Sequence, residues 1–183
     1  MTSPAFSPAA TAAASSLTEL KSLYDEMAQP LRRALARLAG PGCDADDLLQ
    51  EVFVVALKRP EQVLAAVSPK AWLYGVAVRV AAGARTRRRF RSFLGLESAG
   101  EVAADDAAGP FAAVTRIEAR AKVHKALDAL SGKRREALVL FELEGLTGPE
   151  ISEALDIPIK TVWTRLHHAR KDFEHRLKQE GRE

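Results

Sequence analysis

The stretch TGPEISEALDIPIKTVWTRLHHARK, residues 147–171, decides the fold of the C-terminal part of the chain. Thr147 and Glu150 have the spacing of a capping box, which predicts that a short helix begins here. The turn DIP (156–158) separates it from a longer helix, roughly 159–178. Two helices joined by a tight turn are the layout of a helix-turn-helix, whose second helix enters the major groove of DNA.

The longer helix is amphipathic. Apolar residues at helical spacing form one stripe, expected to pack on the short helix: Ile159, Val162, Leu166, Ala169, Phe173 and Leu177. The remaining side chains suit phosphates and base edges, and the candidate DNA contacts are Lys160, Thr161, Trp163, Thr164, Arg165, His167, His168 and Lys171. A merely solvated helix is the alternative that these residues alone leave open.

Two adjacent histidines raise the question of a metal site. Metal ligands on one helix require i,i+4 spacing, whereas His167 and His168 point about 100° apart. His168 does share a face with Asp172 and His175. Contacts with DNA, or simple exposure, fit the histidines better, so we expect no metal and no cofactor.

Helical spacing also dominates the rest of the chain, and no strand pattern is convincing. The predicted fold class is all-α, with two small helical domains joined by a flexible acidic linker. Further helices are expected over 17–38, 44–59, 70–91, 111–129, 133–143 and 149–155, with a loop at 60–69. The predicted organisation is a disordered tail (1–16), a first domain (17–94), the linker (95–115) and a second domain (116–183).

Charge is concentrated in one block. The net charge is only +3, but residues 70–96 carry 7 basic and no acidic side chains, which favours a polyanionic partner. Trp72, Gly75 and Arg79 share one helical face just before the arginine run. Small residues there would let a DNA backbone approach, and Trp72 could stack on an unpaired base. Alternatively, Trp72 and Tyr74 are core aromatics.

The segment DADDLLQEVF (44–53) begins with Asp44 as a candidate N-cap. Its acidic side chains indicate either ordinary helix-start acidity or a docking surface for a basic partner. Catalytic motifs of the phosphate-loop, nucleophile-elbow and zinc-protease types do not occur, so an enzyme is not expected. The single Cys43 suits a reducing cytoplasm, and neither a secretory signal nor a run of about 18 apolar residues occurs, so no membrane insertion is expected.

Three motifs in order, DADDLLQEVF, PKAWLYGVAVRVA followed by arginines, and LDALSGKRREALVLFELEGLTGPEISEALDIPIKTVWTRLHHAR, resemble those of bacterial sigma factors of the extracytoplasmic-function (group IV) family. The resemblance covers roughly residues 17–94 and 116–178. It implies a first domain that binds the RNA polymerase clamp and opens the minus-10 element, and a second that docks on the flap and reads the minus-35 element. Core RNA polymerase, promoter DNA and an anti-sigma factor are the implied partners.

The resemblance also assigns residues by position. Those implied to bind polymerase are Asp44, Asp46, Asp47, Gln50, Glu51 and Phe53. Those implied to bind the minus-10 element are Ser68, Lys70, Trp72, Arg79, Arg85, Arg87, Arg88 and Arg89. The candidate contacts at 160–171 fall on the minus-35 recognition helix. Gly75, Arg79, Trp163 and His168 depart from the family's usual residues, which implies unusual promoter elements.

Two rival functions remain at this stage. A free-standing helix-turn-helix regulator would bind operator DNA without polymerase, but it leaves the acidic helix and the aromatic-basic block unexplained. An RNA-binding or nucleoid protein would account only for the charge. Association with core polymerase distinguishes the sigma factor from both.

Overall fold

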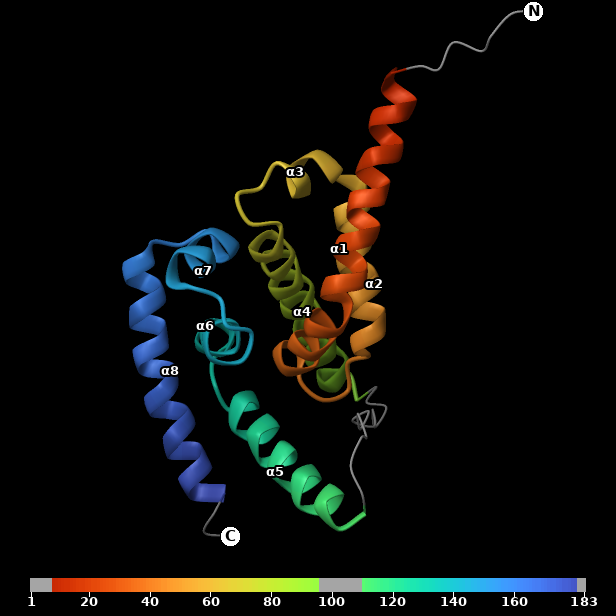
Figure 1. Ribbon diagram of the computed structural model, residues 1–183. Coiled ribbons are helices and arrows are strands. Elements are labelled where there is room, and N and C mark those ends of the chain that lie inside the picture. Colours follow the sequence, from red (N-terminus) through yellow and green to blue (C-terminus); the bar gives the residue numbers. More distant parts are fainter. Residues whose placement is uncertain (1–7, 96–109, 181–183) are drawn as a thin grey trace, which may run out of the picture.

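The computed structural model describes residues 8–95 and 110–180, and every regular element within these ranges is a helix (Figure 1). The elements are α1 (Pro8–Ala39), α2 (Ala45–Lys58), α3 (Pro60–Leu64), α4 (Pro69–Phe93), α5 (Pro110–Asp128), α6 (Gly132–Leu138), the π-helical segment η1 (Val139–Leu143), α7 (Gly148–Leu155) and α8 (Ile159–Glu180). Helices α1–α4 form one half of the molecule, and α5–α8 form the other half beside it. The predicted all-α class with two helical parts is confirmed.

Side-chain caps begin the helices of the first half. The Asp44 carboxylate accepts hydrogen bonds from the backbone N–H groups of Asp46 (2.8 Å) and Asp47 (3.3 Å), so the predicted N-cap of α2 is confirmed. Ser68 caps α4 by accepting from the N–H of Ala71 at 3.1 Å. These caps satisfy backbone donors that have no partner inside a helix.

Two boundaries in this half differ from the prediction. The tail predicted to be disordered over 1–16 is helical from Pro8, because its many alanines are the strongest helix formers. The predicted loop at 60–69 contains the short helix α3, which starts with Pro60 in the first turn and buries Val63. Both corrections lengthen the helical part of the first half.

The second half follows its local signals closely. The predicted capping box is confirmed: the Thr147 hydroxyl accepts from the Glu150 N–H at 3.4 Å, and the Glu150 carboxylate accepts from the Thr147 N–H at 2.8 Å. Gly145 (φ +69°) follows the helix predicted over 133–143, whose final turn is the π-helical η1 rather than α-helical. Asp156 (φ 51°) ends α7 in a left-handed conformation.

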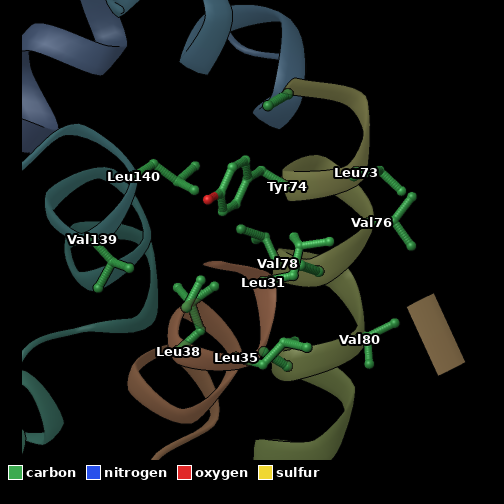
Figure 2. Packing of buried hydrophobic residues seen from close by; sticks show 14 of the residues in the cluster. Leu31, Leu35, Leu38, Leu73, Tyr74, Val76, Val78, Val80, Val139 and Leu140 are labelled. Atoms are coloured by element: carbon green, nitrogen blue, oxygen red, sulfur yellow. The ribbon is translucent and has the colours of Figure 1, made fainter. Parts of the chain in front are cut away.

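One continuous hydrophobic core joins the two halves. Leu31, Leu35 and Leu38 of α1 are fully buried within it. Tyr74 of α4 is 1% exposed and points toward Leu140 of η1, so residues from both halves meet in the same core (Figure 2). Apolar burial on this scale holds the halves together, since each buried side chain contributes about 1.5–3 kcal/mol.

Candidate nucleic-acid interface

The outer face of α8 is open to solvent. Val162, Leu166 and Ala169 are buried on its inner side, as the stripe predicts. The exposed candidates are Lys160, Trp163, Thr164, His167, His168 and Lys171, whereas Thr161 and Arg165 are half-buried. Ile159 was expected in the buried stripe but is 44% exposed, because it is the first residue of α8 and lies at the turn.

Trp163 is both part of this face and a brace for the helix-turn-helix. Its side chain is 46% exposed, yet its ring packs edge-to-face on Phe141 with centroids 5.6 Å apart. The ring also covers Gly148, where an added Cβ would lie 2.6 Å from Trp163 Cζ2. Glycine at the start of α7 therefore allows the indole to lean against the helix-turn-helix.

The histidines of α8 are not part of a metal-like cluster. In the described part of the chain, no group of three or more His, Cys, Asp or Glu side chains is placed to hold a metal ion. Asp172, which shares a face with His168 and His175 in the sequence, forms an ion pair with Arg134 of α6. The rings of His167 and His168 stand edge-to-face with centroids 5.4 Å apart. Their polar edges are thus available on the exposed face.

The arginines of α4 do not all face outward. Arg85 donates to the backbone carbonyl of Leu38 at the end of α1 and pairs with Glu136 of α6 at 2.9 Å. Arg88 donates to the carbonyl of Pro41. Both arginines were predicted to contact DNA, but here they satisfy carbonyls at and just beyond a helix C-terminus, which lack helical partners.

The other basic side chains of α4 remain at the surface. Lys70, Arg79 and Arg89 are exposed. Arg87 is also exposed and lies 3.5 Å from Glu51 of α2, an ion pair that contributes little in water. A cationic surface therefore persists along α4, although it is smaller than the arginine run suggests.

The N-terminal part of α4 is covered by α7. An added Cβ at Gly75 would lie 2.5 Å from the carbonyl oxygen of Ala154, so the space that the sequence suggested for a DNA backbone is occupied by this chain's own backbone. Ser68 donates to Glu150 of α7 at 3.4 Å. Trp72 is half-buried and packs against the core, as the core-aromatic interpretation predicts, and its stacking on an unpaired base stays a prediction.

The residues of the 44–53 segment that are implied to bind polymerase are exposed, except Phe53. The outward residues form the acidic face of α2 and are Asp44, Asp46, Asp47, Gln50 and Glu51. Asp46 pairs with Arg32 of α1 at 2.8 Å. Phe53, implied to contact polymerase, is only 8% exposed and packs edge-to-face on Tyr24 at 4.7 Å. It supports the acidic face from the core side of α2.

A buried carboxylate between the halves was missed by the sequence analysis. The side chain of Glu144 is 4% exposed and accepts from Arg37 Nη1 (2.8 Å) and from the Tyr74 hydroxyl (2.9 Å). Burial, with the adjacent Glu144 charge, raises the pKa of Tyr74 above its usual range. These partners lie 70 and 107 residues apart from Glu144 in the sequence, so no local pattern could have revealed them.

Comparison with known proteins identifies this arrangement. The family model described as "Sigma-70 region 2" matches residues 23–91, and the one described as "Sigma-70, region 4" matches residues 120–173. The ECF RNA polymerase sigma factor SigL of Mycobacterium tuberculosis is 30% identical over 171 residues, which cover 93% of this chain and 95% of SigL. The chain belongs to the extracytoplasmic-function sigma factors.

Other relatives agree with this assignment. The RNA polymerase sigma-H factor of Pseudomonas aeruginosa is 31% identical over 150 residues, covering 78% of each chain. In fold, the sigma factor is similar to RpoE of Bartonella quintana, solved with the anti-sigma factor NepR (TM-score 0.68, 22% identity, covering 87% of this chain and 97% of RpoE). It is also similar to CnrH, solved with the cytosolic domain of CnrY (TM-score 0.67, 23% identity, 93% and 95% covered).

The family membership establishes the general function. As a sigma factor, the protein directs RNA polymerase to promoters and initiates transcription there, and the predicted function is confirmed at this level. Sigma factors are in general DNA-binding regulators rather than catalysts. In the described ranges, no helix is both long and apolar enough to cross a membrane.

Proposed function

We propose that this sigma factor contacts promoters through two surfaces and RNA polymerase through two others. The outer face of α8 reads the minus-35 element, and α4 binds the minus-10 element. The acidic face of α2 docks on the polymerase clamp, and the second half docks on the flap. The observation that carries the proposal is the face of α8, which is polar, exposed and free of acidic residues from Lys160 to Lys171.

The residues of α8 divide by chemistry. Lys160 and Arg165 neutralise phosphates, which fixes the position of the helix but carries no sequence information. Thr164, His167 and His168 present hydroxyl and imidazole groups that hydrogen-bond base edges in the major groove. Thr161, Trp163 and Lys171 complete the surface at its edges. A helix reading DNA near its N-terminal turns is the docking geometry of helix-turn-helix proteins.

The residues of α4 suit a melted element. Trp72 offers an aromatic ring on which an unpaired base stacks, worth about 1–3 kcal/mol. The positive charges near it hold the phosphates of the same strand. The proposed minus-10 contacts remain Ser68, Lys70, Trp72, Arg79, Arg85, Arg87, Arg88 and Arg89.

Neither surface needs to bind tightly alone. Tethering both to polymerase raises their effective concentration at the promoter, so two weak contacts at a fixed spacing give specific binding. A protein partner of the anti-sigma class is proposed as well, because the similar RpoE structure is a complex with the anti-sigma factor NepR, and the similar CnrH structure is a complex with the cytosolic domain of CnrY. The site of action would be the cytoplasm, where RNA polymerase transcribes the chromosome.

The minus-35 assignment is tested with Lys160→Ala in polymerase reconstituted from purified core and this sigma factor. The matched control is Lys178→Ala on the same helix, where the lysine pairs with Glu174 at 2.6 Å. We expect Lys160→Ala to lower initiation at minus-35-dependent promoters by about tenfold while core binding is unchanged, because a phosphate contact is lost. Loss of core binding in Lys160→Ala, or equal loss of initiation in both variants, would contradict the assignment.

The clamp assignment is tested with Asp47→Lys, which reverses a charge on the exposed face of α2. Asp25→Lys on α1 is the control for net charge. Reversal of a charge in a complementary interface should weaken core binding by about tenfold or more. Equal affinity of the two variants for core polymerase would remove α2 from the clamp interface.

A further inference from the structure

We propose that a cavity between α4 and the turn joining α5 to α6 binds a small oxyanion of the phosphate class. The cavity has a volume of about 170 Å³, and the residues that line it include Arg85, Arg89 and Arg135. The inference goes beyond the proposed function, because neither polymerase nor promoter DNA takes part in it. It adds a site for a small ligand to a protein whose other proposed contacts are with macromolecules.

The first observation is an excess of positive charge around the cavity. Three arginines line it, and none of the described lining residues is acidic. Glu136 pairs with Arg85 at 2.9 Å, and Asp128 pairs with Arg135 at 2.8 Å. Arg89 has no acidic partner among the residues that the structure describes. The cluster therefore keeps a positive charge beside a space that an anion can enter.

The second observation is an unsatisfied donor on Arg135, which is only 4% exposed. Its Nη atoms donate to the backbone carbonyls of Leu38 (3.3 Å) and Asp128 (2.8 Å), but its buried Nε has no hydrogen-bond partner in the described ranges. Burial lowers the pKa of Arg135, the Asp128 charge opposes this, and the charges of neighbouring arginines lower it further. A buried donor without an acceptor is unfavourable, so an oxyanion in the cavity would bring acceptor oxygens to a guanidinium that lacks one.

The class of ligand follows from size and donor chemistry. Because one water occupies about 30 Å³ in the liquid, the cavity has room for about five water molecules, which suffices for a tetrahedral oxyanion. Whole drug-sized ligands occupy pockets of about 300–1,000 Å³. Guanidinium forks match the oxygens of phosphate in pairs. The ligand is therefore inorganic phosphate, or the terminal phosphate of a molecule whose remainder stays in solvent.

The walls of the cavity favour a small ion over the backbone of a DNA duplex. Arg85 and Arg89 approach from α4, while Leu130, Gly132 and Arg135 come from the second half. An added Cβ at Gly132 would lie only 3.1 Å from Arg85 Nη2, so the two walls come close together. A phosphate of a duplex carries its sugars with it and needs a wider approach, whereas a free oxyanion does not.

The first test measures binding of inorganic phosphate to the full-length protein, without polymerase or DNA. Thermal denaturation is compared in phosphate and in chloride at equal ionic strength, and calorimetric titration gives the affinity. Phosphate should raise Tm, because a ligand that binds only the folded protein stabilises it by mass action. The same Tm in both salts would overturn the proposal.

Arg89→Gln locates the site. Arg89 forms no ion pair in the described ranges, and Arg91→Gln is the matched control, because Arg91 is exposed on the same helix about 200° away. Arg89→Gln should weaken phosphate binding by about tenfold or more, since a hydrogen bond between two charged groups is lost. Arg91→Gln should leave the affinity unchanged. Equal affinities of the two variants for phosphate would contradict the assignment.

A second pair of variants puts a carboxylate where the oxyanion would lie. Thr86 is exposed and lines the cavity. Compared with Thr86→Gln, Thr86→Glu should have the higher Tm in chloride and should lose the rise that phosphate causes. The pair is matched in size and in helix propensity, so only the charge differs. If phosphate raises the Tm of both variants equally, the ion binds elsewhere and the proposal fails.

Further ligands distinguish the possible sources of the phosphate. Inorganic phosphate, pyrophosphate, a nucleoside diphosphate and a scrambled DNA duplex are titrated into the same variants. Tightest binding by inorganic phosphate would assign the site to the free ion, and tighter binding by the diphosphates would assign it to a terminal phosphate; either result supports the cavity. Arg89-dependent binding of the duplex without binding of inorganic phosphate would assign the arginines to DNA and overturn the inference.

Discussion

The two proposed DNA surfaces differ in how far the rest of the molecule covers them. The face of α8 is buried only on its inner side, where Val162, Leu166 and Ala169 lie, and its polar side points to solvent. The face of α4 is shared with the other half of the molecule, which approaches it at Gly75. The polar side of α8 is therefore open along its length, whereas contact with the other half covers α4 at Gly75 and leaves basic side chains such as Lys70 and Arg79 exposed.

The difference has a physical origin in the helices themselves. α8 carries an apolar stripe of ordinary width, so one side suffices for its burial. The middle of α4 is apolar nearly all round, and Leu73, Tyr74 and Val76 are buried in succession. A helix of this kind needs partners on several sides, and the second half supplies one of them.

The largest expected effect is a loss of stability when a buried residue behind the α8 face is truncated. Leu166 is 1% exposed, so Leu166→Ala should lower the free energy of unfolding by about 2–5 kcal/mol through lost burial and an unfilled cavity. Urea denaturation of the full chain measures it, with exposed Thr164→Ala as the control. A single transition for the whole chain would show that the shared core couples the two halves. Two transitions would show that the half containing α8 unfolds independently.

The next effect concerns the buried contact between the two halves, in which Glu144 meets Tyr74 and Arg37. Tyr74→Phe keeps the ring in the core but removes the hydroxyl that donates to Glu144, and a hydrogen bond to a charged group contributes about 1.5–3 kcal/mol. We expect a loss of stability of this size in urea denaturation, accompanied by faster backbone amide exchange in α7. Unchanged exchange in α7 would mean that the hydroxyl does not hold the halves together.

A third prediction concerns Trp163 of α8, which departs from the residue usual in the family. Gly148→Ala places a Cβ 2.6 Å from Trp163 Cζ2, so the indole must turn away from Phe141. In a Trp72→Phe background Trp163 is the sole tryptophan, and its emission should shift to the red as it enters water. Minus-35 preference should change with it. Unshifted emission would show that the ring already stands free of α7.

The smallest effect is that of the capping box. Thr147→Ala should cost about 1 kcal/mol. Hydrogen bonds from the backbone N–H and hydroxyl of Thr147 lower the pKa of Glu150 below 4.5. The carboxylate's contribution is therefore fully present above pH 4.5 and lost as pH falls through the folded-state value. Urea denaturation should show that the stability lost in Thr147→Ala is smaller in acid, below the folded-state pKa of Glu150, than at pH 7. An equal loss of stability at both pH values would mean that Glu150 does not contribute.

Local signals in the sequence predicted what local physics controls. The N-cap Asp44, the capping box at Thr147 and the buried stripe of α8 depend on residues a few positions apart, so their pattern is readable. The buried contact between the halves was not predictable, because Glu144 meets Tyr74 and Arg37 only after the whole chain has folded. The hydrogen-bond partner of Arg85 was unpredictable for the same reason, since the Leu38 carbonyl lies 47 residues away in the sequence. The sequence shows that Arg85 is charged, but not which carbonyl oxygen accepts its hydrogen bond.

The most direct test compares promoter binding by the protein alone and by the protein with core RNA polymerase. Fluorescence anisotropy with a promoter fragment and a scrambled fragment measures both cases, and run-off transcription confirms initiation. We predict weak, salt-sensitive and nearly unselective binding by the free protein, and selective binding with promoter-specific transcripts when core is added. Tight selective binding by the free protein, or no association with core polymerase, would contradict the account.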